Sequence, residues 1–290
     1  MFSGSITALA TPFNKSGEVC IKTYKKLVKW QLAQGSDGIV VAGCTGENFT
    51  LHQDEKDEML KASLDAARGK FSIIMGTGSA ETAAAIEQTK RAKKIGADGA
   101  LVITPFGNKP SQKAMIAHYN AIANIGLPII LYNVPSRTGS NLLPEAVIEL
   151  AKHPNIVAIK EASGNIDQVS AILRSVPKNF VVLSGDDSLT LPMMVLGAKG
   201  VISTVSNIAP GEFAKMAHSF LTGDIEAARK IHHKLFPVIK ALFVEGNPVP
   251  LKAAMEIMGL CENRLRAPLT PASEQTMKLL KNALSDAGLI

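Results

Sequence analysis

The sequence predicts an α/β fold, a closed (β/α)8 TIM barrel with a C-terminal helical extension. Short apolar runs alternate with longer segments of helical periodicity, and there are eight such runs. They recur every ~20–35 residues, close to the ~30 residues of one βαβ unit. Eight parallel strands with crossover helices close naturally into a barrel, and an open doubly wound sheet is the alternative.

The expected strands are short and β-rich, and the segments between them are amphipathic. The strand runs are Ser5–Ala10, Gly38–Ala42, Phe71–Met75, Gly99–Ile103, Pro128–Tyr132, Ile156–Ile159, Phe180–Leu183 and Gly200–Ser203. The clearest helical segments are Ile21–Gln34, Asp54–Arg68, Thr82–Ile95, Gln112–Ile125 and Pro144–Lys152. Most of these segments end at Gly or Pro, as helix stops do.

The pattern changes after the eighth run. We expect residues 1–209 to form the barrel and residues 210–290 to form a helical region without further strands. The segment Asn247-Pro248-Val249-Pro250 interrupts that region, because proline removes an amide donor and disfavours helix at the residue before it.

Length and composition indicate a well-packed globular protein. The chain has 290 residues, 46% of them hydrophobic and 19% charged, and one barrel of about 250 residues accommodates most of it. No apolar run approaches the roughly 18 residues of a membrane helix. The N-terminal sequence has no basic region before its apolar residues. We therefore expect neither a membrane span nor a secretory signal, and a cytoplasmic location.

Cysteine usage and charge narrow the class of protein further. Cys20, Cys44 and Cys261 are odd in number and widely spaced, which is typical of reduced thiols and not of a disulfide framework. The formal charge is +6, but the basic residues are scattered and no basic run is interleaved with aromatics. We expect no nucleic-acid partner, and an enzyme whose field favours anionic metabolites.

Lys160 is the most informative candidate residue. It follows the apolar run Ile156–Ile159, so it lies at the carboxyl end of a predicted buried strand. Desolvation there would lower the pKa of its amine toward the range in which the neutral form attacks a carbonyl. A Schiff-base lysine is the functional interpretation. The structural alternative is a lysine that extends to solvent with its stem on apolar neighbours.

Two other strand ends add to Lys160. The fifth run ends at Tyr132, and Arg137 follows five residues later, so a phenol and a carboxylate-binding guanidinium would lie at the same barrel end. The second run ends in a turn with two glycines, Gly43–Glu47, whose amides and Thr45 hydroxyl could face a small anion. Together these residues fit a pyruvate-type α-keto acid.

Other motifs give no sign of a cofactor or a metal. Gly76-Thr77-Gly78 lacks the third glycine of a dinucleotide fingerprint, since Glu81 holds that position, and there is no P-loop. Asp186 and Asp187 are adjacent in a turn and would point apart, and the six histidines form no metal-binding pattern. We expect neither a metal nor a cofactor.

The turns carry a specific family resemblance. The motifs are G-x-T-G-E at 43–47, G-T-G at 76–78, Y-N-V-P-S-R-T-G at 132–139, I-K-E-A-S-G-N at 159–165, S-G-D-D at 184–187 and N-P-x-P-x-K at 247–252. With these motifs, the sequence resembles the dihydrodipicolinate synthase family of pyruvate-dependent, Schiff-base aldolases over essentially its whole length.

The resemblance implies the condensation of pyruvate with aspartate 4-semialdehyde, the committed step toward diaminopimelate and lysine. Lys160 would form the imine with pyruvate, and Tyr132 would shuttle protons. Thr45 would bind the pyruvate carboxylate, and Arg137 the carboxylate of the semialdehyde.

The resemblance also implies a backbone lining and an assembly. Backbone groups of Gly185 and Ile202 would line the pyruvate pocket. The family commonly forms homotetramers built as dimers of dimers, so we expect a homotetramer or a homodimer.

Two positions depart from the family pattern. The family joins its active-site tyrosine to a threonine in the first turn and to a second tyrosine from a neighbouring subunit. The matching positions here are Cys44 and Gly107. A thiol is a weaker donor than a hydroxyl, and glycine has no side chain. General acid–base assistance contributes typically 10²–10⁴-fold, so we expect a slower condensation.

The resemblance also bears on regulation. Many members are inhibited by lysine at a site between subunits. The positions that would form it here do not match, because Phe49 adds bulk, Lys56 adds a like charge and Ala84 removes an acidic partner. We expect insensitivity to lysine. The positions are Asn48, Phe49, Gln53, Lys56, Ala80, Ala84 and Phe106.

Two other functions remain open at this stage. One is a related Schiff-base enzyme, an N-acetylneuraminate lyase or a keto-deoxy-sugar-acid aldolase, against which Arg137 and its motif argue. The other is a non-catalytic keto-acid-binding protein whose proton relay has decayed, which only Cys44 and Gly107 support.

Overall fold

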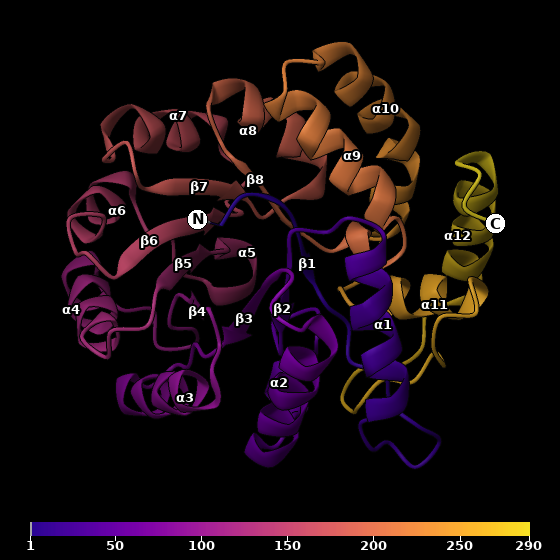
Figure 1. Cartoon of the computed structure of the whole chain (residues 1–290), viewed down its shortest axis with the longest axis horizontal. Helices are drawn as coiled ribbons and strands as arrows, with labels where there is room; N and C mark the ends of the chain where they lie inside the picture. The colour runs from indigo at the N-terminus through magenta and orange to yellow at the C-terminus, as the bar shows by residue number, and fades with distance from the viewer. Residues whose placement is uncertain (1) are drawn as a thin grey trace.

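The computed structural model describes residues 2–290 and contains a closed barrel of parallel strands in sequence order (Figure 1). Each strand pairs with the next, and β1 closes the barrel against β8. This confirms the predicted TIM barrel and excludes an open sheet. The strands are β1 Gly4–Ala8, β2 Gly38–Val41, β3 Ser72–Gly76, β4 Gly99–Ile103, β5 Ile129–Asn133, β6 Ile156–Glu161, β7 Val181–Ser184 and β8 Gly200–Ser203.

Helices surround the strands as an outer ring (Figure 1). The main helices of this ring are α1 Ile21–Ala33, α2 Gln53–Ala67, α3 Thr82–Ile95, α4 Gln112–Ala123, α6 Pro144–Leu150, α7 Ile166–Ser175, α8 Thr190–Leu196 and α9 Pro210–Leu221. Short elements at the carboxyl ends of strands are η1 Asn48–Thr50, α5 Pro135–Thr138, η2 Asp187–Leu189 and η3 Val205–Asn207. The predicted helices agree with those found to within two residues at each end.

The apolar residues form two layers. One fills the barrel interior, with Ile6, Val40, Ile74, Ile130 and Ile202 among its members. The other lies between the strands and the helices and extends around the whole barrel. Because both faces of a parallel sheet are buried, the strands are continuously apolar, and this is why the runs were recognisable in the sequence.

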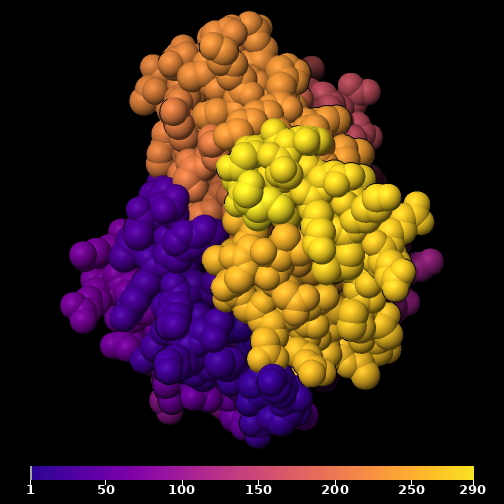
Figure 2. All heavy atoms as spheres, turned by 90° about the vertical axis from the view of Figure 1, so that its right-hand side faces the viewer, coloured from indigo at the N-terminus to yellow at the C-terminus, as the bar shows by residue number. Residues whose placement is uncertain are grey.

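The chain continues after α9 as α10 Ile225–Ala241, α11 Val249–Ile257 and α12 Glu274–Asp286. Figure 2 shows the segment from α11 to the C-terminus, in yellow, packed between α10 in orange and the indigo N-terminal region. Proline begins α9 at Pro210, where its missing amide hydrogen costs nothing. The division of the chain at residue 210 stays a prediction. Within residues 2–290, no helix has both the length and the apolar character needed to cross a membrane.

Candidate active site

The carboxyl ends of the strands surround a cavity of about 510 Å³. Thr45, Tyr132, Arg137, Lys160 and Gly185 all line it, although they come from four different turns of the chain. The structure therefore brings five of the predicted site residues together, whereas Cys44 and Ile202 are not part of this lining, and the roles of all seven stay predictions. Several residues of the C-terminal part, Ile239, Lys240, Phe243, Glu245, Gly246 and Asn247, complete the lining.

Lys160 lies near the end of β6 and is only 5% exposed. Its Nζ atom lies over the ring of Tyr132, 4.4 Å from the ring centroid. The two residues are direct neighbours in the β5–β6 register. Burial lowers the pKa of the Lys160 amine to about 8, because the charged form loses its hydration. The buried amine is therefore neutral in a larger fraction of molecules than the amine of an exposed lysine.

Tyr132 and Cys44 lie next to each other beside the lysine. Burial raises the pKa of the Tyr132 phenol, so the phenol keeps its proton and can donate it. Burial also raises the pKa of the Cys44 thiol, although the cations Arg137 and Lys160 oppose this effect. A neutral thiol at this position is a weak donor beside the phenol.

Asn247 lines the cavity, although the sequence analysis placed it only in a helix interruption and a family motif and gave it no role in the site. Its Nδ2 atom donates a hydrogen bond to the Thr45 hydroxyl, over 3.0 Å. Its carbonyl oxygen accepts one from Arg137 Nη2, over 2.9 Å. The Thr45 hydroxyl also lies 3.3 Å from Thr204 Oγ1. The two predicted carboxylate-binding residues are therefore joined through the C-terminal part of the chain.

The backbone at Gly185 passes so close to Lys160 that only glycine fits there. A Cβ atom at this position would lie 2.7 Å from Ala162 Cβ and 2.9 Å from Lys160 Cγ. Its amide donates to the Glu161 carbonyl oxygen, over 2.7 Å. The Ile202 side chain lies in the barrel core. That its backbone lines the pyruvate pocket stays a prediction.

Asp187 is a second residue that the sequence analysis did not assign to the site. Its carboxylate is 2% exposed and accepts hydrogen bonds from the amides of Thr204 and Val205, over 3.0 and 3.1 Å. Burial raises its pKa to about 6, and the nearby Lys160 cation opposes that rise. Asp186 and Asp187 were expected only to point apart in a turn, so nothing in the local sequence pattern indicated this burial.

Gly107 lies in an open part of the structure. It has φ +84°, and nothing lies within 4 Å of the position of an added Cβ atom. Its neighbour Phe106 packs edge-on against Phe49, with ring centroids 5.1 Å apart. None of the residues 104–108 is part of the cavity lining that the structure describes.

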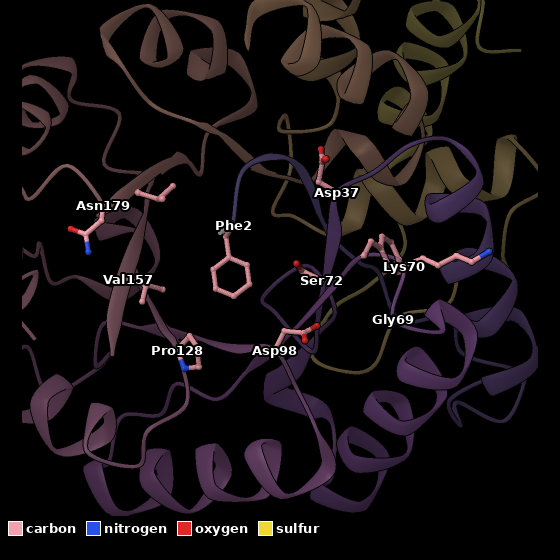
Figure 3. Close-up of a pocket in the computed structure, with 11 residues that line it drawn as sticks. Phe2, Asp37, Gly69, Lys70, Ser72, Asp98, Pro128, Val157 and Asn179 are labelled. Atoms are coloured by element: carbon pink, nitrogen blue, oxygen red, sulfur yellow. The ribbon is translucent and has the colours of Figure 1, made fainter. Parts of the chain in front are cut away.

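A second cavity, of about 650 Å³, lies at the amino-terminal ends of the strands. Figure 3 shows the Phe2 ring in the middle of this opening and Lys70 directed away from it. Its two carboxylates are already bound to backbone amides, Asp37 to Ser5 and Asp98 to Ile73, each over 2.7 Å. These two carboxylates therefore hold the loops at this end of the barrel in place.

A metal site would require several ligand side chains close together. No group of three or more His, Cys, Asp or Glu side chains gathers to hold an ion anywhere in residues 2–290.

Comparison with known families decides the affiliation. The model of the dihydrodipicolinate synthetase family matches residues 1–287. The chain belongs to this family. It is 48% identical to the 4-hydroxy-tetrahydrodipicolinate synthase of Geotalea daltonii over 291 residues, with all of each chain covered.

Solved structures of the dihydrodipicolinate synthetase family also match this chain over its full length. The pyruvate-complexed dihydrodipicolinate synthase of Acinetobacter baumannii is 43% identical, with a TM-score of 0.98 and full coverage of both chains. A monomeric dihydrodipicolinate synthase variant is 42% identical, with a TM-score of 0.98, covering 100% of this chain and 98% of the other.

Proposed function

We propose that this chain is a 4-hydroxy-tetrahydrodipicolinate synthase that condenses pyruvate with aspartate 4-semialdehyde on the way to diaminopimelate and lysine. One observation carries the proposal: the buried Lys160 amine, with its pKa lowered to about 8, lies 4.4 Å from the centroid of the Tyr132 ring in a cavity that also holds Arg137.

Imine formation is the first step. The neutral Lys160 amine attacks the ketone carbon of pyruvate and gives a carbinolamine, and loss of water gives the imine. Tyr132 supplies the proton that the leaving hydroxide requires and later takes one back. The Thr45 hydroxyl, which accepts a hydrogen bond from Asn247, has its own proton available for the pyruvate carboxylate.

Carbon–carbon bond formation follows. The imine loses a proton from the pyruvate methyl group and becomes an enamine, whose carbon attacks the aldehyde of the second substrate. Arg137 lies at the cavity with one guanidinium nitrogen on the Asn247 carbonyl, which leaves its other donors for the carboxylate of the semialdehyde. The amine of that substrate then attacks the imine carbon, closes the ring and releases Lys160.

We infer a slower condensation than the full proton relay would allow. Cys44 and Gly107 stand where the family has a hydroxyl and a second phenol, and the Cys44 thiol has a pKa raised by burial. Tyr132 would then exchange protons mainly with water or substrate groups.

We also propose a homotetramer or a homodimer in the cytoplasm. Phe49, Leu143 and Val195 are exposed apolar side chains suited to subunit contacts. The three cysteines are unpaired, which is typical of a reducing compartment.

A coupled assay tests the proposal. The protein receives pyruvate and aspartate semialdehyde with excess dihydrodipicolinate reductase, and NADPH consumption is followed. We expect activity that disappears in Lys160→Ala. Absence of activity in a protein that still traps pyruvate with borohydride would point instead to another Schiff-base aldolase or to a non-catalytic keto-acid-binding protein.

A further inference from the structure

The outer face of the barrel carries a buried polar network directly behind Lys160 and Tyr132. Successive residues of a strand point to opposite faces, so Glu161 and Asn133 point away from the cavity into which their neighbours project. Glu161 is 1% and Asn133 0% exposed. Asn133 Nδ2 donates to Glu161 Oε2 over 3.0 Å. The same two strands therefore pair twice, once in the cavity and once behind it.

The register of β5 and β6 makes this second pair consequential. The ladder shifts by one residue between Ile129 and Ile130, and only after that shift does Tyr132 lie opposite Lys160 and Asn133 opposite Glu161. A shift of one residue moves a side chain to the other face of a sheet. A side-chain hydrogen bond at the carboxyl end of the two strands favours the shifted register, because a slip would separate its partners.

The network also closes the loop that carries Arg137. Asn133 Oδ1 accepts from the Leu142 amide over 2.9 Å, and its Nδ2 donates to Asn141 Oδ1 over 2.8 Å. Gln168 of α7 donates to Glu161 Oε2 over 3.2 Å and accepts from Asn141 over 3.0 Å. The chain between the end of β5 and Leu142 is thus tied at both of its ends to the outer face.

The third donor fixes the loop after Lys160. Glu161 Oε1 accepts from the Ser163 amide over 2.6 Å. The carboxylate thus accepts three hydrogen bonds on two oxygens, and no cation pairs with it among residues 2–290. An amide has one oxygen, so Glu161→Gln must turn an NH2 group toward at least one of these donors.

We propose that Glu161 and Asn133 are positioning residues, which hold the Lys160 amine against the Tyr132 phenol and the Arg137 loop in place by a hydrogen-bonded lock on the opposite face of the barrel. Neither side chain reaches the cavity, and both act through the residue before them. The inference rests on the proposed function, because its consequence is the rate at which Lys160 forms an imine.

The experiment measures the rate of borohydride-trapped pyruvate adduct by mass spectrometry at quenched times. We expect Glu161→Gln to bind pyruvate but to form the adduct at least ~10-fold more slowly, and to raise the KM for aspartate semialdehyde. The double variant Asn133→Asp with Glu161→Gln reverses donor and acceptor. It should recover part of the lost rate, which a merely destabilised protein would not do.

Thr89→Val is the matched control. Thr89 Oγ1 lies 2.8 Å from Thr77 Oγ1, a buried pair behind the end of β3 that does not line the cavity. We expect the rate of adduct formation in Thr89→Val to stay within twofold of the wild-type rate. This should hold even if Thr89→Val loses as much melting temperature as Glu161→Gln.

Each outcome has a separate meaning. Wild-type protein that forms no adduct at Lys160 would refute the proposed function. A wild-type rate in folded Glu161→Gln would overturn the positioning role. If that variant does not fold, Gln168→Ala, which removes one donor to Glu161, should slow adduct formation about threefold, and an unchanged rate there would overturn the role as well.

Discussion

Asn247 donates a hydrogen bond to the hydroxyl of Thr45 across 202 residues of sequence. The residue that we expect to bind the pyruvate carboxylate is therefore oriented by the C-terminal part of the chain. A site that looks like a product of the barrel strands depends on a segment outside them.

Removal of this side chain should weaken pyruvate use. Asn247→Ala leaves the Thr45 hydroxyl without its donor but keeps the backbone carbonyl that binds Arg137. We expect kcat/KM for pyruvate to fall ~10-fold, the effect of one lost hydrogen bond at ~1 kcal/mol or slightly more. A double-mutant cycle with Thr45→Val measures the coupling. Additive effects of the two changes would argue against this orientation.

The pH dependence of imine formation should report Lys160. Only the neutral amine attacks, and its pKa is lowered to about 8, so the adduct rate should rise from pH 6.5 and level off above pH 9. Asp187, with a pKa of about 6, titrates below this rise, and the raised pKa values of Tyr132 and Cys44 place them above it. Borohydride trapping at quenched times across this pH range checks the assignment of the rise to Lys160. A midpoint near pH 10.5 would contradict it.

Restoration of the relay should speed the condensation. Cys44→Thr exchanges a weak donor for a hydroxyl beside Tyr132, and we expect kcat to rise. Gly107→Tyr has open space but requires a left-handed backbone, so we expect it to lower the melting temperature by the equivalent of ~1–2 kcal/mol. Steady-state rates of both variants and of the double variant give the answer, and no gain in any of them would refute the broken relay.

A buried ion pair between Lys252 and Glu47 should stabilise the turn Gly43–Glu47. Lys252 is 0% exposed, and its Nζ atom lies 3.3 Å from Glu47 Oε1 and 2.7 Å from the Arg264 carbonyl oxygen. Lys252→Met leaves a buried carboxylate unpaired and should cost about 3–5 kcal/mol. Urea unfolding measures the loss. Lys252→Met with Glu47→Gln should cost less, and an equal cost would show that the charge is not the cause.

Lysine should not inhibit the enzyme. Phe49 is 58% exposed and packs against Phe106 where an effector would need space. Lys56 would also repel an effector ammonium, although burial lowers the pKa of its own amine. Activity in millimolar lysine should equal activity without it. Clear inhibition would refute this prediction.

The barrel and the position of Lys160 and Tyr132 at one end of it were predictable because local signals coincide there. Strands buried on both faces read as apolar runs, and Lys160 interrupts one of them. Asn247 and Asp187 were not assigned, since their part in the site depends on long-range contacts with Thr45 and with the Thr204 amide. The β5–β6 shift was equally hidden, because a sequence pattern contains each strand but not its alignment with the next.

The position of Asn247 also has a consequence for synthesis on the ribosome. Lys160 and Tyr132 are made first, but β1 pairs only with β2 until β8 has been made, and Thr45 lacks its donor for more than 40 residues after that. Glu47 likewise waits for Lys252 and Arg266. A nascent chain therefore carries Lys160 long before it has a complete cavity, and we expect it to gain activity toward keto acids only as the final helices leave the exit tunnel.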